Sequence, residues 1–204
     1  MSLVARLTER VRTVVDGGRA AALPVPPVGF TDGTIALRPW RPSDGLDLAA
    51  LCEDEAIHRW TSVPRQYKAA EAAGNAAWAE EQRKEGRGVH LAITDARDAV
   101  LLGAVDLTIP GGDRTTGRVS FLLRAGSRGA GHATRAVRLL EPWAFRTVGV
   151  DVLEIRPQAG NEDAIGVARR AGFTAAPGSD APDAEGRVTY VRRAGDPVPE
   201  GLQG

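Results

Sequence analysis

The residues of this chain that could do chemistry gather first in a short glycine-containing segment. Residues 128–133 read Arg-Gly-Ala-Gly-His-Ala, between an apolar run at 119–123 and an amphipathic stretch at 133–148. The pattern predicts a tight turn from a strand into a helix, because glycine adopts the backbone conformations that such a turn needs. Successive N–H groups would then point into one concavity, beside the positive end of the helix dipole. The segment therefore predicts a binding site for an anion, most often a phosphate or pyrophosphate.

Two well-known phosphate-binding loops do not match this segment. A Rossmann dinucleotide loop is disfavoured, because no Gly-x-Gly-x-x-Gly follows an early strand. A Walker loop is excluded, because the chain contains neither Gly-Lys-Ser nor Gly-Lys-Thr. The identity of the anion must therefore come from the rest of the chain.

The composition is that of an ordinary soluble globular protein, with 204 residues, 43% apolar and 25% charged. Its 26 basic and 26 acidic residues cancel, so we expect no nucleic-acid partner and no attraction to anionic lipid. No apolar run is long enough to span a membrane, and charged residues interrupt the region where a signal peptide would need an apolar core. We therefore expect a cytoplasmic protein.

Cysteine and histidine are too few and too scattered to predict a metal site. Cys52 is the only cysteine and stands in a leucine-containing stretch, so we expect a core residue and no disulfide. The three histidines, His58, His90 and His132, lie far apart in the sequence. We therefore expect no metal cofactor.

The two ends of the chain differ from its centre. Residues 3–15 have helical spacing of apolar side chains, and residues 23–29 are rich in proline. We expect residues 1–29 to form a helical appendage with a linker, packed on its own subunit, packed on a partner subunit or mobile. The main domain is then residues 30–194, and residues 195–204 form a tail without a core-forming pattern.

Hydrophobic periodicity within the main domain predicts strands and helices in an irregular order. The expected strands are residues 34–38, 89–95, 100–109, 117–124, 151–156 and 187–192, with a further strand after residue 173. The expected helices are residues 43–53, capped by Ser43, and residues 68–85, 133–148 and 161–171, the third with a kink or a new turn at Pro142. This order predicts a mixed α/β (α+β) fold rather than a strictly alternating one.

Three segments, in order and suitably spaced, carry a family resemblance. Residues 35–40 read Ile-Ala-Leu-Arg-Pro-Trp and are followed by Ser43-Asp44. Residues 128–134 fit an Arg/Gln-x-x-Gly-x-Gly/Ala signature at each fixed position. Asn161 is followed ten residues later by Ala171-Gly172-Phe173. On these residues the chain resembles the GNAT superfamily of acyl-CoA-dependent N-acyltransferases, and within it the RimJ/RimL-like branch.

The resemblance implies a fold and a co-substrate. It implies a splayed mixed sheet of six to seven strands flanked by about four helices, with the gap between the strands at 117–124 and 151–156. It also implies acetyl-CoA as co-substrate, with pantetheine in that gap. An amide-bearing arm can pair with the unpaired groups of a splayed strand as a further strand would.

The resemblance also implies which residues bind the CoA thioester. Backbone groups of Leu122, Leu123 and Arg124 would pair with pantetheine, and Asn161 would hydrogen-bond the same arm. The pyrophosphate would lie on the signature segment, which comprises Arg128, Gly129, Ala130, Gly131, His132, Ala133 and Thr134.

The residues expected for acid–base chemistry depart from the family pattern. Ala168 stands where many members carry a tyrosine that protonates the leaving thiolate, and Ala164 stands where the branch often has a serine. Gly117-Arg118 replaces an acidic residue sometimes found at the head of the central strand. Asp106, on the preceding strand, is the best remaining candidate for the catalytic base; the alternative is a surface carboxylate on an exposed strand face.

Residues on the expected substrate side are candidates for contact with the acceptor. Trp60 lies between helices near the expected entrance, beside His58. Glu55 belongs to an acidic cluster at 53–55 that favours a cationic acceptor. Tyr190, on the last strand, would border the same cavity.

The sequence thus leads to an acetyl-CoA-dependent N-acetyltransferase that acts on a primary amine, either a protein N-terminus or a small amine. Transfer from succinyl-CoA or another acyl-CoA is an alternative, with Arg118 or Arg124 meeting a distal carboxylate. A CoA-ester-binding regulatory protein without catalysis is another, because Ala164 and Ala168 lack acid groups. The oligomeric state stays open, with a homodimer among the alternatives.

Overall fold

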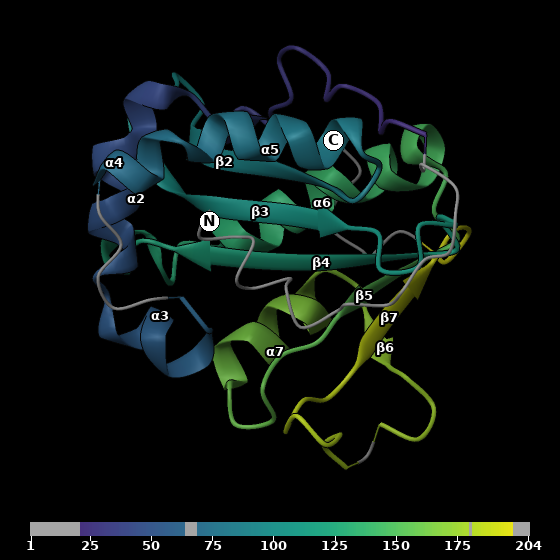
Figure 1. Ribbon diagram of the computed structural model, residues 1–204. Helices are drawn as coiled ribbons and strands as arrows, with labels where there is room; N and C mark the ends of the chain where they lie inside the picture. Colours follow the sequence, from purple (N-terminus) through teal and green to yellow (C-terminus); the bar gives the residue numbers. More distant parts are fainter. Residues whose placement is uncertain (1–20, 64–68, 180, 198–204) are drawn as a thin grey trace.

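A single mixed sheet organises the molecule (Figure 1). The computed structural model describes residues 21–63, 69–179 and 181–197. The described residues form a 7-stranded sheet in the order β1-β2-β3-β4-β5-β7-β6. The strands are β1 (Ile35–Pro39), β2 (Gly88–Asp95), β3 (Leu101–Thr108), β4 (Thr116–Leu123), β5 (Val152–Ile155), β6 (Thr174–Ala175) and β7 (Tyr190–Arg193). All described strand pairs are antiparallel except β4 with β5, which is parallel.

The helices cover both faces of this sheet. They are α2 (Gly45–Cys52), α3 (Glu55–Trp60), α4 (Ala69–Ala73), α5 (Asn75–Lys84), α6 (His132–Trp143) and α7 (Glu162–Arg170), with short 3-10 or π segments η1 (Pro42–Asp44), η2 (Ala125–Ser127) and η3 (Ala144–Val148). The predicted mixed fold and the seven strands of the implied sheet are confirmed. None of the helices within the described ranges is long and apolar enough to cross a membrane.

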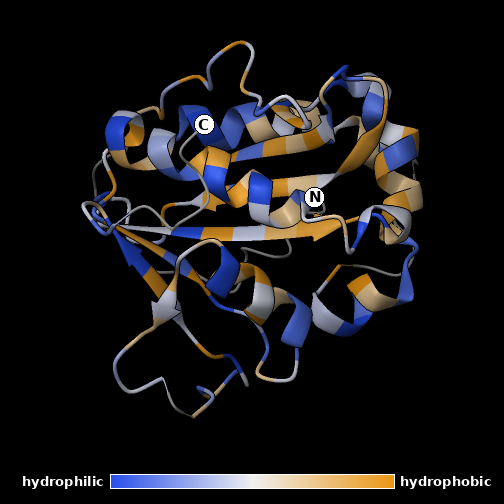
Figure 2. Ribbon diagram, turned by 180° about the vertical axis from the view of Figure 1, so that it is seen from behind, coloured by the Kyte–Doolittle hydropathy of each residue, from blue (hydrophilic) through white to orange (hydrophobic). Residues whose placement is uncertain are grey.

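Two hydrophobic cores, one on each face, hold the layers together. The first core is shared with α6 and α7 and includes Val105 and Leu107 of β3. The second core is shared with α2 and α5 and includes Ala104 of the same strand. This division follows from the alternation of side chains along a strand. Figure 2 shows the central strands mostly in hydrophobic colours. Cys52 is fully buried in the second core, as the sequence predicts.

The sheet opens between β4 and β5. These strands pair only through Thr116–Val152, Gly117–Leu153 and Arg118–Glu154. β4 then continues to Leu123 along β3, while β5 ends at Ile155 and Pro157 follows. In Figure 1 the two strands diverge, with α3 and α7 beside the opening. The gap implied by the family resemblance is therefore confirmed.

Several boundaries differ from the sequence prediction. The first helix begins as η1, and the side chain of Asp44 rather than Ser43 accepts the hydrogen bond from Arg41 N, at 2.7 Å. The helix predicted over 68–85 is divided at Gly74 into α4 and α5. Beyond Pro142, α6 ends at Trp143 and the π segment η3 follows, which fits the expected disturbance by proline.

The last strand starts later than predicted, at Tyr190 instead of residue 187. The strand is preceded by a loop that the Asp183 side chain stabilises. Its carboxylate accepts hydrogen bonds from Glu185 N and Arg187 N, both at 2.9 Å. These local bonds replace the ladder bonds of a strand.

The described part of the N-terminal linker packs on the main domain. Leu23 is only 1% exposed and belongs to the first core. Its amide donates to Arg83 O at 2.9 Å, and its carbonyl accepts from Arg83 Nη1 at 2.5 Å. The helix predicted for residues 3–15 and the end of the tail, residues 198–204, lie outside the described residues.

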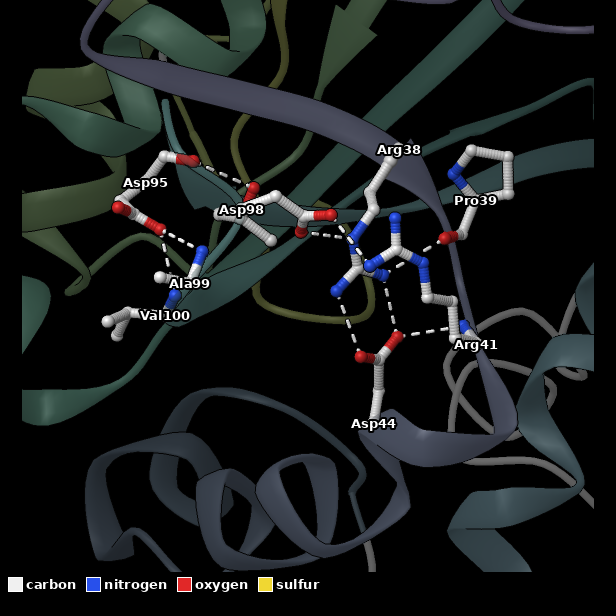
Figure 3. A network of polar contacts seen from close by, with 9 residues as sticks. Arg38, Pro39, Arg41, Asp44, Asp95, Asp98, Ala99 and Val100 are labelled. Carbon is white, nitrogen blue, oxygen red and sulfur yellow. Dashed lines mark hydrogen bonds and ion pairs between the residues drawn. The ribbon is translucent and has the colours of Figure 1, made fainter.

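An arginine-centred network joins β1 to its neighbours (Figure 3). Arg38 donates to both carboxylate oxygens of Asp44, at 2.7 and 2.9 Å, and to Asp98 at 2.5 Å. Arg41 pairs with the same Asp98 at 2.6 Å. The network therefore fastens the β2–β3 turn and η1 to β1.

Candidate active site

The glycine segment folds as a cradle of main-chain nitrogens at the start of α6. Gly129 and Gly131 have φ angles of 76° and 79°, in the left-handed region that glycine favours. The first backbone bond of α6 runs from Arg135 N to Gly131 O at 3.0 Å, so the amides of residues 132–134 precede the helical ladder. The strand–turn–helix prediction is confirmed.

The cradle is open and offers donors to an anion. A Cβ built on Gly129 or Gly131 meets nothing within 4 Å. Thr134 is 6% exposed, and its buried hydroxyl has no hydrogen-bond partner among the described residues. Free amides, an unpartnered hydroxyl and the positive end of a 12-residue helix fit a phosphate or pyrophosphate.

The side chains of His132 and Arg128 shape this cradle. His132 Nδ1 lies 3.0 Å from Ser127 O, so its ring holds the turn and leaves its amide to the cradle. Arg128 Nη2 donates to Asp54 Oδ2 at 2.5 Å and to Leu123 O at 2.9 Å. Arg128 therefore ties the start of α3 and the end of β4 to the turn.

The open edge of β4 is formed by alternate residues. Arg124 N donates to Leu102 O at 2.9 Å, which continues the β3–β4 ladder. By the alternation of an antiparallel ladder, the peptide groups of Leu122 also point to β3, while those of Phe121 and Leu123 point into the gap. The amide of Arg124 is therefore taken up by the β3–β4 ladder, and Phe121, which the sequence pattern did not single out, faces the gap with Leu123.

Asn161 lies at the start of α7, across the gap. Its Oδ1 accepts from Ala164 N at 3.1 Å and caps the helix, so its amide nitrogen is the group left for a ligand. Ala168, at the position of the family tyrosine, is completely buried. It offers no group to a leaving thiolate.

Asp106 is a buried carboxylate, not the exposed strand residue that the sequence allowed as an alternative. It is 2% exposed, lies 2.9 Å from His90 Nδ1 and accepts from Ser120 Oγ at 3.3 Å. His90 is also buried and its ring lies 4.5 Å from that of Trp78. Ser120 is exposed and pairs with Asp106 across β3 and β4, on the same face of the sheet. Its hydroxyl therefore connects the protein surface to the buried pair of Asp106 and His90.

The predicted acceptor residues fall into two places. Trp60 ends α3, lies 3.7 Å from a Cβ built on Gly160 in the loop before α7, and stacks on Arg59 at 4.7 Å. His58 Nδ1 lies 3.2 Å from Val63 O, and Glu55 is exposed in the first turn of α3. These residues lie beside the gap.

Tyr190 lies elsewhere. It is 7% exposed within the first core, and its hydroxyl accepts from Arg169 Nη2 of α7 at 3.1 Å. Its packing is that of a core residue on the α6–α7 face. Among the described residues, no group of three or more His, Cys, Asp or Glu side chains is arranged to hold a metal ion.

Comparison with known proteins assigns the family. Residues 34–174 match the model of the acetyltransferase (GNAT) domain. Since the match spans more than half of the sequence, the chain belongs to the GNAT acetyltransferase family and is an N-acyltransferase. A search among curated proteins gave no match.

Solved structures share the fold at low sequence identity. The microcin C7 self-immunity acetyltransferase MccE, in complex with acetyl-CoA and AMP, superposes with a TM-score of 0.68 at 18% identity, over 82% of this chain and 100% of that one. Mycobacterium smegmatis RimJ, in complex with CoA-disulfide, gives 0.68 at 16% identity, over 79% and 83%. RimL, a ribosomal L7/L12 α-N-protein acetyltransferase in complex with coenzyme A, gives 0.67 at 17%, over 84% and 97%. At these identities the similarity concerns the fold.

Proposed function

We propose that this chain transfers an acetyl group from acetyl-CoA directly to a primary amine, with both substrates bound together. The observation that carries the proposal is the continuity of the amide cradle at residues 129–134 with the open edge of β4. A CoA thioester needs both features, a diphosphate site and a slot for its amide-containing arm. The solved structures of MccE and RimL with acetyl-CoA or CoA support the same donor.

The length of the gap suits the donor. Beyond Arg118, β4 runs unpaired with β5 for the five residues from Val119 to Leu123, or about 16 Å at the rise of an extended strand. With the diphosphate on the cradle, the arm would run back along β4 toward Arg118. Its thioester would then lie beside Ser120 and Phe121, and the amide nitrogen of Asn161 would bind the arm from α7.

The reaction asks little covalent chemistry of the protein, because a thioester is already activated. The amine nitrogen attacks the carbonyl carbon, a C–N bond forms, and the C–S bond then breaks. A backbone N–H of Phe121 or Leu123 would stabilise the intermediate oxyanion. The nitrogen loses one proton to the leaving thiolate, so the catalytic contribution of the site is mainly placement of the two substrates.

The ammonium form of the acceptor must lose a proton before it attacks. Ser120 would accept that proton on Oγ while passing its own to the Asp106 carboxylate. Asp106 would then be neutral, and His90 would hold its other oxygen. In this scheme Ser120 contacts the acceptor, whereas Asp106 receives the proton without touching substrate.

The acceptor is a protein N-terminus or a small amine. Trp60, His58 and Glu55 beside the gap would contact it, on the face of the sheet opposite α6 and α7. The acidic cluster at 53–55 speaks less for a cationic acceptor than the sequence suggested, because the Asp54 carboxylate is held by Ala56 N and Arg128.

Calorimetry and a thiol-release assay test this function. We expect acetyl-CoA to bind in the micromolar range and free thiol to appear with at least one member of a broad amine panel. Absence of binding at millimolar acetyl-CoA would refute the proposal. Binding without thiol release from any amine would instead favour a CoA-ester-binding regulatory protein, the alternative suggested by the buried Ala168.

A further inference from the structure

Three arginines gather on the acceptor side of the gap. Arg118 is the last residue of β4 paired with β5, and Arg156 follows the end of β5. Side-chain alternation puts Arg118, Ser120, Glu154 and Arg156 on the face opposite the first core, because Gly117 and Leu153 face that core. Arg187 joins them from the loop before β7, where its Nη1 donates to Arg156 O at 3.3 Å.

The carboxylates near these arginines satisfy them only in part. Arg118 Nη2 lies 3.6 Å from Glu154, beyond hydrogen-bond distance, and the buried Arg118 Nε has no hydrogen-bond partner among the described residues. Arg156 pairs with Asp183, whose carboxylate also closes its own loop. Arg187 Nε lies 3.3 Å from Glu185 without hydrogen-bond alignment.

The three arginines repel one another, although each also has one carboxylate nearby. Burial lowers the pKa of Arg118, and the nearby charges of Arg156 and Arg187 lower it further, against the opposite effect of Glu154. An additional anion at this place would relieve that repulsion. Arginine also presents paired N–H groups that match a carboxylate or a phosphate.

The position relates these arginines to the reacting centre. Ser120 and Arg156 each lie two residues beyond the last paired residues, on opposite sides of the gap. An amine beside Ser120 would thus bring its own substituents next to Arg118 and Arg156. The other arginine considered from the sequence, Arg124, is already paired with Asp47 at 2.7 Å.

We infer that Arg118, Arg156 and Arg187 form an anion subsite that binds a carboxylate or phosphate carried by a substrate beside the reacting amine. The acceptor is the favoured source, because the arginines project on the face from which it approaches. The distal carboxylate of an acyl chain is the other source of the same chemistry. The inference rests on the proposed function and names the substrate class for it.

Matched substrate pairs and variants test the subsite. One arm compares kcat/KM for an amino acid and its amide with acetyl-CoA, and the other compares succinyl-CoA with butyryl-CoA and a neutral amine. We expect the anionic member of one pair to be preferred by roughly tenfold or more, the scale of one charge-assisted hydrogen bond. Arg156→Gln and Arg118→Gln should each abolish the preference while keeping turnover of the neutral member. The control variant Arg87→Gln replaces an exposed arginine just before β2 and should keep the preference for the anionic substrate.

A binding measurement decides the question without turnover. Phosphate bound at the cradle should raise the Tm of the native chain and of Arg156→Gln equally. Phosphate bound at the arginine subsite should add a further rise in Tm in the native chain only. Thiol release without preference in either arm, or a preference that survives both variants, would overturn the subsite. If no amine is acetylated, the proposed function fails, and an equal phosphate effect on the two Tm values would then overturn the subsite independently.

Discussion

Ser120 joins the exposed face of β4 to the buried pair of Asp106 and His90. If the serine passes the acceptor's proton to Asp106, its replacement should slow the chemical step. We expect Ser120→Ala to lower kcat by about 10²-fold, within the usual range for acid–base assistance, and to leave the Kd of acetyl-CoA unchanged. Thr116→Ala, at the paired start of the same strand, should leave kcat unchanged.

Asp106→Asn separates a role in proton transfer from a role in folding. The asparagine keeps an oxygen for His90 but has no charge to receive a proton. The variant should therefore lower kcat as Ser120→Ala does, while the Kd of acetyl-CoA and the far-UV circular dichroism stay native. An unaltered kcat together with a lower Tm would make Asp106 a structural residue only.

Cys52 is predicted to be inert in the native protein. Burial in the second core raises the pKa of its thiol to about 12, so the thiol is neutral at physiological pH. The folded pKa of this thiol lies above its ordinary value of 9.0. The contribution of the neutral thiol to the free energy of unfolding is therefore complete below pH 9 and is lost as pH rises through the folded pKa. A thiol reagent at pH 8 should titrate no cysteine until denaturant is added; rapid labelling of the native chain would contradict the burial.

At the scale of elements, the cradle can be tested against a matched glycine. Gly129 and Gly178 both have a φ of 76°, and a Cβ on either meets nothing within 4 Å. Valine at either position should therefore cost a similar stability, about 1–2 kcal/mol. Only Gly129→Val puts a side chain into the cradle, so only that variant should raise the Kd of acetyl-CoA, by tenfold or more in calorimetry. Equal affinities for the two variants would place the diphosphate elsewhere.

The arginine network of β1 in Figure 3 should make the stability depend on pH. Burial raises the pKa of Asp98, but hydrogen bonds from Arg38 and Arg41 outweigh this effect and lower it below 3.8. Its contribution is therefore present above pH 4 and is lost as pH falls through the folded value. The urea midpoint of the native chain should drop between pH 5 and pH 3, and Arg38→Gln should make that drop smaller. The same drop in both proteins would exclude the network as its cause.

The elements themselves were largely predictable, because hydrophobic periodicity and the glycines at 129 and 131 are local signals. The pairing of strands and of side chains across the fold could not be predicted from the sequence. Which peptide groups of β4 face the gap depends on the β3–β4 register, so the sequence pattern indicated Arg124, whose amide the ladder takes up, and not Phe121. Partners far apart in sequence, such as Arg128 with Asp54 or His90 with Asp106, are set by packing that no local pattern records.

At the scale of the whole molecule, helices close one face of the sheet and only partly cover the other. One core with α6 and α7 closes the first face, and α2, α4 and α5 cover the first strands on the other. Ser120, the one exposed residue of β4, and the opening beside this strand are left between α3 and α7 (Figure 1). This arrangement gives the donor a slot in the plane of the sheet and the acceptor an approach from one side.

A crystal structure of the chain with acetyl-CoA tests this account most directly. We predict the diphosphate on the amides of residues 129–134, the pantetheine arm between β4 and β5 against Phe121 and Leu123, and the thioester beside Ser120. A thioester bound outside this gap, or β4 and β5 paired along their whole length with the ligand present, would contradict it.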